Sequence, residues 1–144
     1  MVQHNEGTRE DLVKYRIETA KGDLKSAKLL LAANEFRGAN NRAYYSIYHV
    51  ISAVHALDGR AYKRHKDALA NFNKDYIRTE IFPRPFGRRI AEAEEIRHAS
   101  DYDDFYLATK SEAEEVIATA EELIDMIEEY CIGRMEQDSE RNRE

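Results

Sequence analysis

The segment 97–102, Arg-His-Ala-Ser-Asp-Tyr, combines residue types that could bind and cleave a phosphodiester. Arg97 and Asp101 are four residues apart, so they would share one face of a helix. A guanidinium can bind a phosphate through two hydrogen bonds and stays charged at any relevant pH. Arg97 is therefore the leading candidate for holding a phosphate, and Asp101 could orient it. Tyr102, whose free pKa is about 10, could position or donate a proton.

A second group of candidates lies on the segment 39–57, where Arg42, Tyr45 and His49 recur at helical spacing. Together they form a polar and aromatic stripe that must face a groove, a partner or solvent. His49 and His98 titrate near neutral pH, so both could exchange a proton in a reaction.

Each candidate also has a purely structural interpretation. Arg97 and Asp101 could form only a helix-end ion pair, worth a few tenths of a kcal/mol. Tyr102 is equally compatible with a core or an interface position, and His49 with a hydrogen-bonded structural role. The cluster of Tyr44, Tyr45 and Tyr48 favours packing over base stacking.

Apolar residues that recur every three or four positions, with only six Gly and two Pro, predict an all-α protein. The expected architecture is an antiparallel up-and-down bundle of four long helices and one shorter helix. Their expected ranges are about 8–33, 39–57, 65–78, 88–100 and 109–133. The segment 39–57 is apolar over so wide an arc that it should be the central helix.

The length of 144 residues predicts one domain, for which we expect residues 1–134, followed by a polar, disordered tail at 135–144. Gly133 is expected to end the last helix. The single Cys131 excludes an internal disulfide and makes a reducing cytoplasm the default location. No long apolar run predicts a membrane helix. Neither a metal nor another cofactor is expected, because helical His pairs and Gly-rich phosphate loops are missing.

Charge is unevenly distributed along this acidic chain, whose formal net charge is −6. The stretch 60–97 holds ten Lys and Arg against six acids, whereas 111–129 holds eight acids and no Lys or Arg. The overall charge argues against a generic nucleic-acid binder. The basic stretch could nevertheless hold an RNA backbone locally, or the two stretches could be solvated faces of opposite sign.

Three segments in order resemble the HEPN superfamily (higher eukaryotes and prokaryotes nucleotide-binding), and most closely its small stand-alone branch labelled UPF0332. They are Asn-Arg-Ala-Tyr-Tyr-Ser-Ile-Tyr-His at 41–49, His65 before the next helix, and Arg97 to Tyr102. The resemblance spans about residues 24–127. It implies a bundle of four or five helices that usually dimerises.

Many members of the superfamily are ribonucleases that act without a metal. Their hallmark is an Arg followed, after four to six residues, by a His, and two such segments meet across the dimer in one cleft. Stand-alone members are often toxins encoded beside a nucleotidyltransferase antitoxin. In this chain Tyr102 stands where the hallmark has its His, so whether the chain is an enzyme stays open.

Two functional hypotheses follow from the resemblance and the residues together. The first is a toxin–antitoxin component that cleaves RNA as a homodimer, and the second is a non-catalytic module that binds a nucleotide or a partner nucleotidyltransferase. The catalytic candidates are Arg97, Tyr102, Asp101 and His49. The candidates for binding RNA or a nucleotide are Arg42, Tyr45, Arg64, His65, Arg88 and His98.

Overall fold

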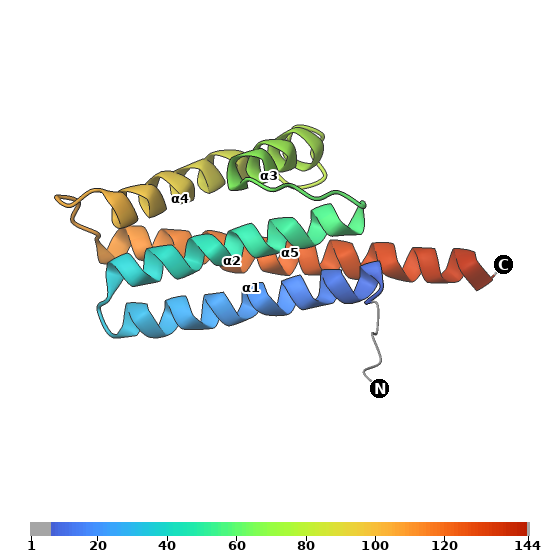
Figure 1. Cartoon of the computed structure of the whole chain (residues 1–144), viewed down its shortest axis with the longest axis horizontal. Helices are drawn as coiled ribbons and strands as arrows, with labels where there is room; N and C mark the ends of the chain where they lie inside the picture. Colours follow the sequence, from blue (N-terminus) through green and yellow to red (C-terminus); the bar gives the residue numbers. More distant parts are fainter. Residues whose placement is uncertain (1–6, 144) are drawn as a thin grey trace.

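The computed structural model describes residues 7–143, which form five α-helices and no strand. Short α3 continues directly into a π-helical turn, η1. Figure 1 shows α1, α2 and α5 side by side, with α3 and α4 forming a layer over them. The predicted all-α bundle of four long helices and one short helix is confirmed. The helices are α1 (Arg9–Ala32), α2 (Phe36–Leu57), α3 (His65–Phe72), η1 (Asn73–Ile77), α4 (Pro85–Tyr102) and α5 (Lys110–Arg143).

Two of the helices begin at side-chain caps. The Thr8 hydroxyl accepts a hydrogen bond from the Asp11 N–H, and the Asp11 carboxylate accepts one from the Thr8 N–H, each at 3.1 Å. Thr109 and Glu112 make the same reciprocal arrangement before α5. Such capping boxes satisfy backbone donors that have no partner within the helix.

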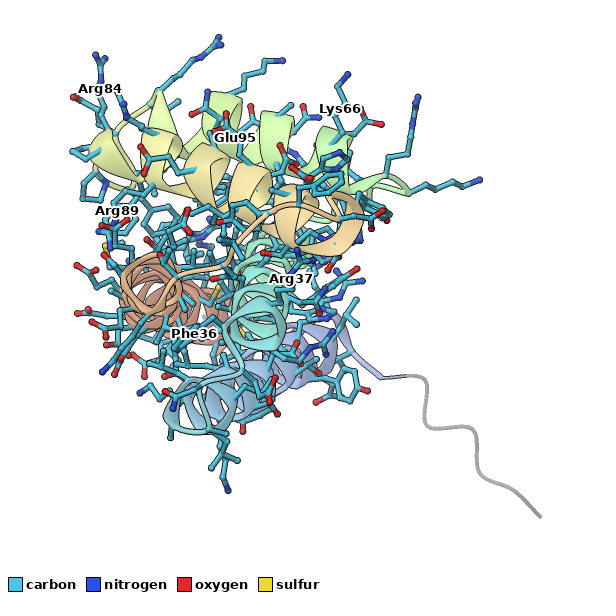
Figure 2. All side chains as sticks on the ribbon, turned by 90° about the vertical axis from the view of Figure 1, so that its left-hand side faces the viewer. Phe36, Arg37, Lys66, Arg84, Arg89 and Glu95 are labelled. Atoms are coloured by element: carbon cyan, nitrogen blue, oxygen red, sulfur yellow. The ribbon has the colours of Figure 1, made fainter. Side chains whose placement is uncertain are left out.

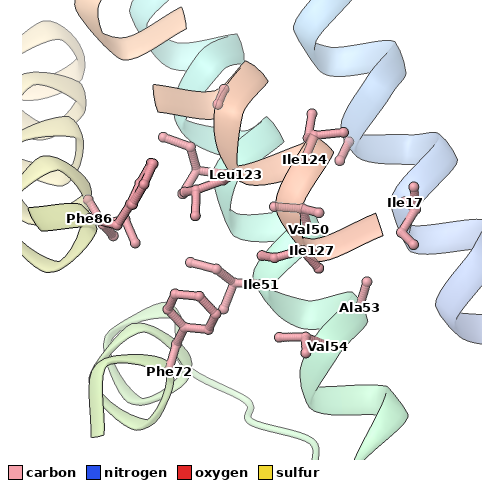
Figure 3. Packing of buried hydrophobic residues seen from close by; sticks show 14 of the residues in the cluster. Ile17, Val50, Ile51, Ala53, Val54, Phe72, Phe86, Leu123, Ile124 and Ile127 are labelled. Atoms are coloured by element: carbon pink, nitrogen blue, oxygen red, sulfur yellow. The ribbon is translucent and has the colours of Figure 1, made fainter. Parts of the chain in front are cut away.

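Helix α2 is the centre of the molecule, as its wide apolar arc predicts. Its Val50, Ile51 and Val54 face α5 and the α3–α4 layer, and Figure 3 shows them packed among residues of these helices, including Phe72 and Ile127. Burying a side chain of this size stabilises the fold by about 1.5–3 kcal/mol. These contacts hold most of the circumference of α2, so the helix is a rigid base for the polar side chains on its remaining stripe.

Helices α2 and α4 are longer than the sequence predicts. Helix α2 begins at Phe36 instead of Ala39, and α4 runs from Pro85 to Tyr102, although the sequence predicts 88–100. Proline is tolerated in the first turn of a helix because the N–H that it lacks would have no partner there. The extension of α4 to Tyr102 places Asp101 on the helix, one turn after Arg97.

The predicted helix end at Gly133 is wrong. Helix α5 continues to Arg143, through most of the segment 135–144 that the sequence predicts to be a disordered tail. Arg134 donates hydrogen bonds to the Asp58 carboxylate at 2.9 Å and to the Tyr130 hydroxyl at 2.7 Å, and Met135 is buried. These contacts offset the roughly 1 kcal/mol by which Gly is less favourable than Ala in a helix.

Candidate functional site

Arg97 lies on the last two turns of α4 and faces α2. Its Nη2 donates a hydrogen bond to the Tyr45 hydroxyl at 3.0 Å, and its Nε is 3.0 Å from a carboxylate oxygen of Asp101. Only 19% of its side chain is exposed. The structure therefore forms the predicted pairing of Arg97 with Asp101 and adds a tyrosine to it.

Aromatic rings surround the Arg97 guanidinium. Its Cζ is 5.3 Å from the ring centroid of Tyr44, 5.4 Å from that of Tyr45 and 5.8 Å from that of Tyr102. A cation at this distance from an aromatic face is attracted by the ring quadrupole. Burial acts to lower the pKa of Arg97, but the neighbouring oxygens of Tyr45 and Asp101 outweigh it and raise that pKa. The guanidinium is therefore a fixed, permanent positive charge.

A chain of polar contacts continues from Asp101 onto α2 and α1. Asn41 donates to both carboxylate oxygens of Asp101, at 3.0 and 3.2 Å, and Arg42 donates to the Asn41 side-chain oxygen at 2.9 Å. Arg42 also reaches an Asp23 carboxylate oxygen at 3.3 Å. This network holds the Asp101 carboxylate, so Asp101 can orient the guanidinium.

His49 lies against the Asp23 carboxylate and not against the Arg97 guanidinium. Its Nε2 is 3.5 Å from an Asp23 carboxylate oxygen, and its ring centroid is 6.3 Å from that of Tyr45. Burial lowers the pKa of His49, and the Asp23 carboxylate opposes that effect. Tyr45 is the shared neighbour of His49 and Arg97, so the structure does not place His49 directly against the guanidinium.

A pocket of about 470 Å³ opens beside Arg97 between α2, α3 and α4. His65, the first residue of α3, contributes to its wall, and the Nδ1 atom of His65 is 3.4 Å from the Tyr44 hydroxyl. Its volume falls within the range of roughly 300–1,000 Å³ typical of small-molecule sites. The lining residues are Tyr44, His65, Glu94, Glu95, Arg97, His98, Ala99 and Asp103.

Tyr102 and His98 are both exposed near Arg97, and of the two only His98 lines this pocket. The Tyr102 residue is 66% exposed, and its ring centroid lies 4.9 Å from that of His98. Tyr102 thus faces Arg97 from the solvent side and is not part of the core. Both rings are accessible to a ligand that reaches the guanidinium.

The structure does not bring Arg64 and Arg88 to Arg97. Both side chains are more than 80% exposed and form ion pairs within their own segments, Arg64 with Asp67 at 3.4 Å and Arg88 with Glu92 at 3.0 Å. Arg88 lines a different groove, of about 490 Å³, between α4 and the α3–η1 segment. Figure 2 shows basic side chains such as Lys66 and Arg84 projecting from the outer side of this layer.

Several residues that organise the site are absent from the sequence-based candidates. Arg37 donates hydrogen bonds to the carbonyl oxygens of Ser100 at 2.7 Å, Asp103 at 3.0 Å and Tyr106, and thereby fixes the link between α4 and α5. Buried Asn40 donates to the Ser100 hydroxyl at 3.1 Å. Two successive Asn residues are unfavourable inside a helix, so Asn40 and Asn41 were a usable signal of side-chain hydrogen bonding.

Two findings concern the described residues as a whole. None of their helices has the length and hydropathy needed to cross a membrane. Among the same residues, no group of three or more His, Cys, Asp or Glu side chains is placed to hold a metal ion.

The comparisons with known proteins all point to one family. The family model described as HEPN domain matches residues 13–130. A UPF0332 protein of Thermotoga maritima is 28% identical over 120 residues, covering 83% of this chain and 91% of that protein. A putative toxin of Methanocaldococcus jannaschii is 30% identical over 123 residues, covering 85% and 90%. The crystal structure of TT1696 from Thermus thermophilus has the same fold, with a TM-score of 0.69, 20% identity and coverage of 81% and 96%.

Proposed function

We propose that this chain, which belongs to the HEPN domain family, is the toxin of a toxin–antitoxin pair and cleaves RNA as a homodimer without a metal ion. Two of its relatives in Methanocaldococcus jannaschii carry the name toxin. The observation that carries the proposal is the placement of Arg97, a largely buried guanidinium held by Tyr45 and Asp101 on the wall of a pocket.

The chemistry of RNA cleavage matches what Arg97 can supply. Attack of a ribose 2′-hydroxyl on the adjacent phosphorus concentrates negative charge on the phosphate oxygens, and a fixed guanidinium stabilises that charge without reorganising. Asp101 positions Arg97, and the exposed Tyr102 can donate a hydrogen bond to the same phosphate. The exposed Arg64 and Arg88 would contact the RNA backbone beyond the pocket.

Cleavage of RNA by the purified chain in the presence of a chelator tests this proposal. The Arg97→Ala variant should cleave about 100-fold more slowly or worse, as expected when a preorganised donor to the transition state is removed. The matched control is Arg141→Ala, which removes an exposed arginine near the end of α5 and should cleave like the wild type. Absence of cleavage by the wild type, or equal rates for wild type and Arg97→Ala, would contradict the proposal.

One observation favours the alternative of a non-catalytic module. Tyr102 occupies the position of the hallmark His and is exposed, which suits binding better than proton transfer at neutral pH. In that case the pocket beside Arg97 would hold a nucleotide, or would receive a partner nucleotidyltransferase. Calorimetry with adenosine nucleotides, compared between wild type and Arg97→Ala, should then show Arg97-dependent binding in a protein that leaves RNA intact.

A further inference from the structure

His65 is held in a defined orientation by three tyrosines of α2. Its ring stacks on Tyr48 with 3.8 Å between centroids, and Tyr45 meets it edge-on at 5.7 Å. Its Nδ1 is 3.4 Å from the Tyr44 hydroxyl. A histidine fixed on one face and at one nitrogen has its other nitrogen, Nε2, left to exchange a proton with a ligand.

Arg97 lies against two of the same tyrosines. Its Cζ is 5.3 Å from the ring centroid of Tyr44 and 5.4 Å from that of Tyr45, and Arg97 and His65 both line the pocket of about 470 Å³. A phosphate bound by Arg97 would therefore share this pocket with an imidazole from another helix. That is the combination of charge stabilisation and proton transfer that cleavage of RNA needs.

Two of the other three described histidines are engaged elsewhere. His49 pairs with Asp23, and buried His55 donates from Nε2 to the carbonyl oxygen of Ala68 at 2.9 Å. His98 is exposed and lies against Tyr102. Among residues 7–143, His65 is thus the histidine that is both held by surrounding groups and open to the Arg97 pocket.

We infer that His65 is the general base of this site and fills the role that the hallmark His would have at Tyr102. The inference rests on the proposed ribonuclease function.

With its Nδ1–H donating to the Tyr44 hydroxyl, neutral His65 takes the proton of the ribose 2′-hydroxyl on Nε2. The 2′-oxygen bonds to phosphorus, and the bond from phosphorus to the 5′-oxygen breaks. The 5′-oxygen takes a proton from water, and His65 returns its proton to the resulting hydroxide. The products are a 2′,3′-cyclic phosphate and a 5′-hydroxyl end.

The charges around His65 suit a base at neutral pH. Burial lowers its pKa below the ordinary 6.5, and the positive charges of Arg97 and His49 lower it further. A neutral imidazole can accept a proton, so the rate should still be maintained at the ordinary histidine pKa of 6.5 and should decline only as the pH falls through the lowered pKa of His65. The ionisable groups that face His65 or line its pocket are Tyr44, Tyr45, Tyr48 and His49 from α2, Glu94, Glu95, Arg97 and His98 from α4, and Asp103 directly after α4.

Single-turnover cleavage by the full chain in chelator, measured from pH 4.5 to 8, tests the inference. The variants are His65→Ala and His65→Asn, because an Asn amide can retain the hydrogen bond to Tyr44 without accepting a proton. Both should cleave about 100-fold more slowly or worse and lose the acidic limb of the pH profile. Their affinity for an RNA with a 2′-deoxy substitution at the cleavage site should stay within about twofold of the wild type. Added imidazole should restore part of the His65→Ala rate but none of the Arg97→Ala rate.

The outcomes separate this inference from the function on which it rests. A wild type that does not cleave RNA overturns both. If the wild type cleaves and Arg97→Ala does not, but both His65 variants keep the wild-type rate and pH profile, only the role of His65 is overturned. If both variants lose cleavage together with binding of the deoxy-substituted RNA, and imidazole restores nothing, His65 is a structural residue and the inference is equally overturned.

Discussion

The position of the Arg97 guanidinium depends on a tyrosine hydroxyl as much as on a carboxylate. The Asp101 carboxylate brings a negative charge to the Nε edge of the guanidinium. Tyr45 accepts a hydrogen bond from Nη2 through a neutral hydroxyl, so it adds no second negative charge. A phosphate can therefore still be attracted, because Asp101 is the carboxylate that pairs directly with the cation and it occupies only the Nε edge. This arrangement makes Tyr45 a positioning residue for Arg97.

Removing the Tyr45 hydroxyl should weaken RNA binding without disturbing the fold. Loss of a hydrogen bond to a charged group costs about 1.5–3 kcal/mol, so Tyr45→Phe should raise the Kd for a 2′-deoxy-substituted RNA by about 10- to 150-fold. The matched control is Tyr15→Phe, which removes a hydroxyl from an exposed tyrosine on α1 and should leave the Kd unchanged. Fluorescence anisotropy titrations measure both values. Equal Kd values for Tyr45→Phe and the wild type would show that Tyr45 does not position Arg97.

Sequence reasoning reached only part of this site, for a physical reason. Arg97 and Asp101 could be paired because a spacing of four residues within one helix fixes their proximity. Asn41 and Asp23 could not be added, because their contacts depend on how α1 and α4 pack against α2. Tyr44 belongs to the packing cluster that the sequence predicts, yet its ring also contacts the functional guanidinium.

At the scale of the elements, tertiary contacts decide where α5 ends. Periodicity predicted the existence of every helix, because each buries an apolar stripe. The local signal of Gly133 was misleading, since Arg134 reaches Asp58 at the end of α2 and Met135 is buried. Such long-range contacts are invisible to reasoning about one segment at a time.

The contact between Arg134 and Asp58 should contribute pH-dependent stability. Burial acts to raise the pKa of Asp58, but hydrogen bonds from Tyr76 and Arg134 outweigh it and hold that pKa below its ordinary value. The stabilisation is therefore fully present above about pH 4 and is lost as the pH falls through the lowered pKa of the folded state. At pH 7, Arg134→Ala should reduce the free energy of unfolding by about 1–3 kcal/mol.

Urea denaturation at a series of pH values from 7 to 3 measures this effect. The difference between wild type and Arg134→Ala should shrink as the pH falls through the lowered pKa of Asp58, because protonation removes the charge that Arg134 binds. Arg141→Ala, on the same helix but exposed, should unfold like the wild type at every pH. A constant difference across the range would mean that Arg134 stabilises by packing and not through the Asp58 carboxylate.

For the whole molecule, the link between α4 and α5 is where we expect the proposed homodimer to form. Phe105 and Leu107 are 94% and 85% exposed, although Arg37 holds the backbone around them through three carbonyl oxygens. Apolar side chains displayed on a fixed backbone are typical of interaction surfaces. They lie next to Asp103, which lines the Arg97 pocket, so a dimer through this link would bring two such pockets together.

Breaking this surface should dissociate the proposed homodimer and reduce RNA cleavage with it. Burial of one large apolar side chain contributes about 1.5–3 kcal/mol, so replacing it by a charge in Phe105→Asp should raise the dimer Kd at least about tenfold. Leu29→Asp is the matched control, because Leu29 is an exposed apolar residue on α1, outside the link. Sedimentation equilibrium should give twice the 16.7 kDa chain mass for the wild type and for Leu29→Asp, but a lower mass for Phe105→Asp. A monomeric wild type would contradict the dimer. A dimer that survives Phe105→Asp but not Leu29→Asp would place the interface on α1, where the two Arg97 pockets would not be joined through the link.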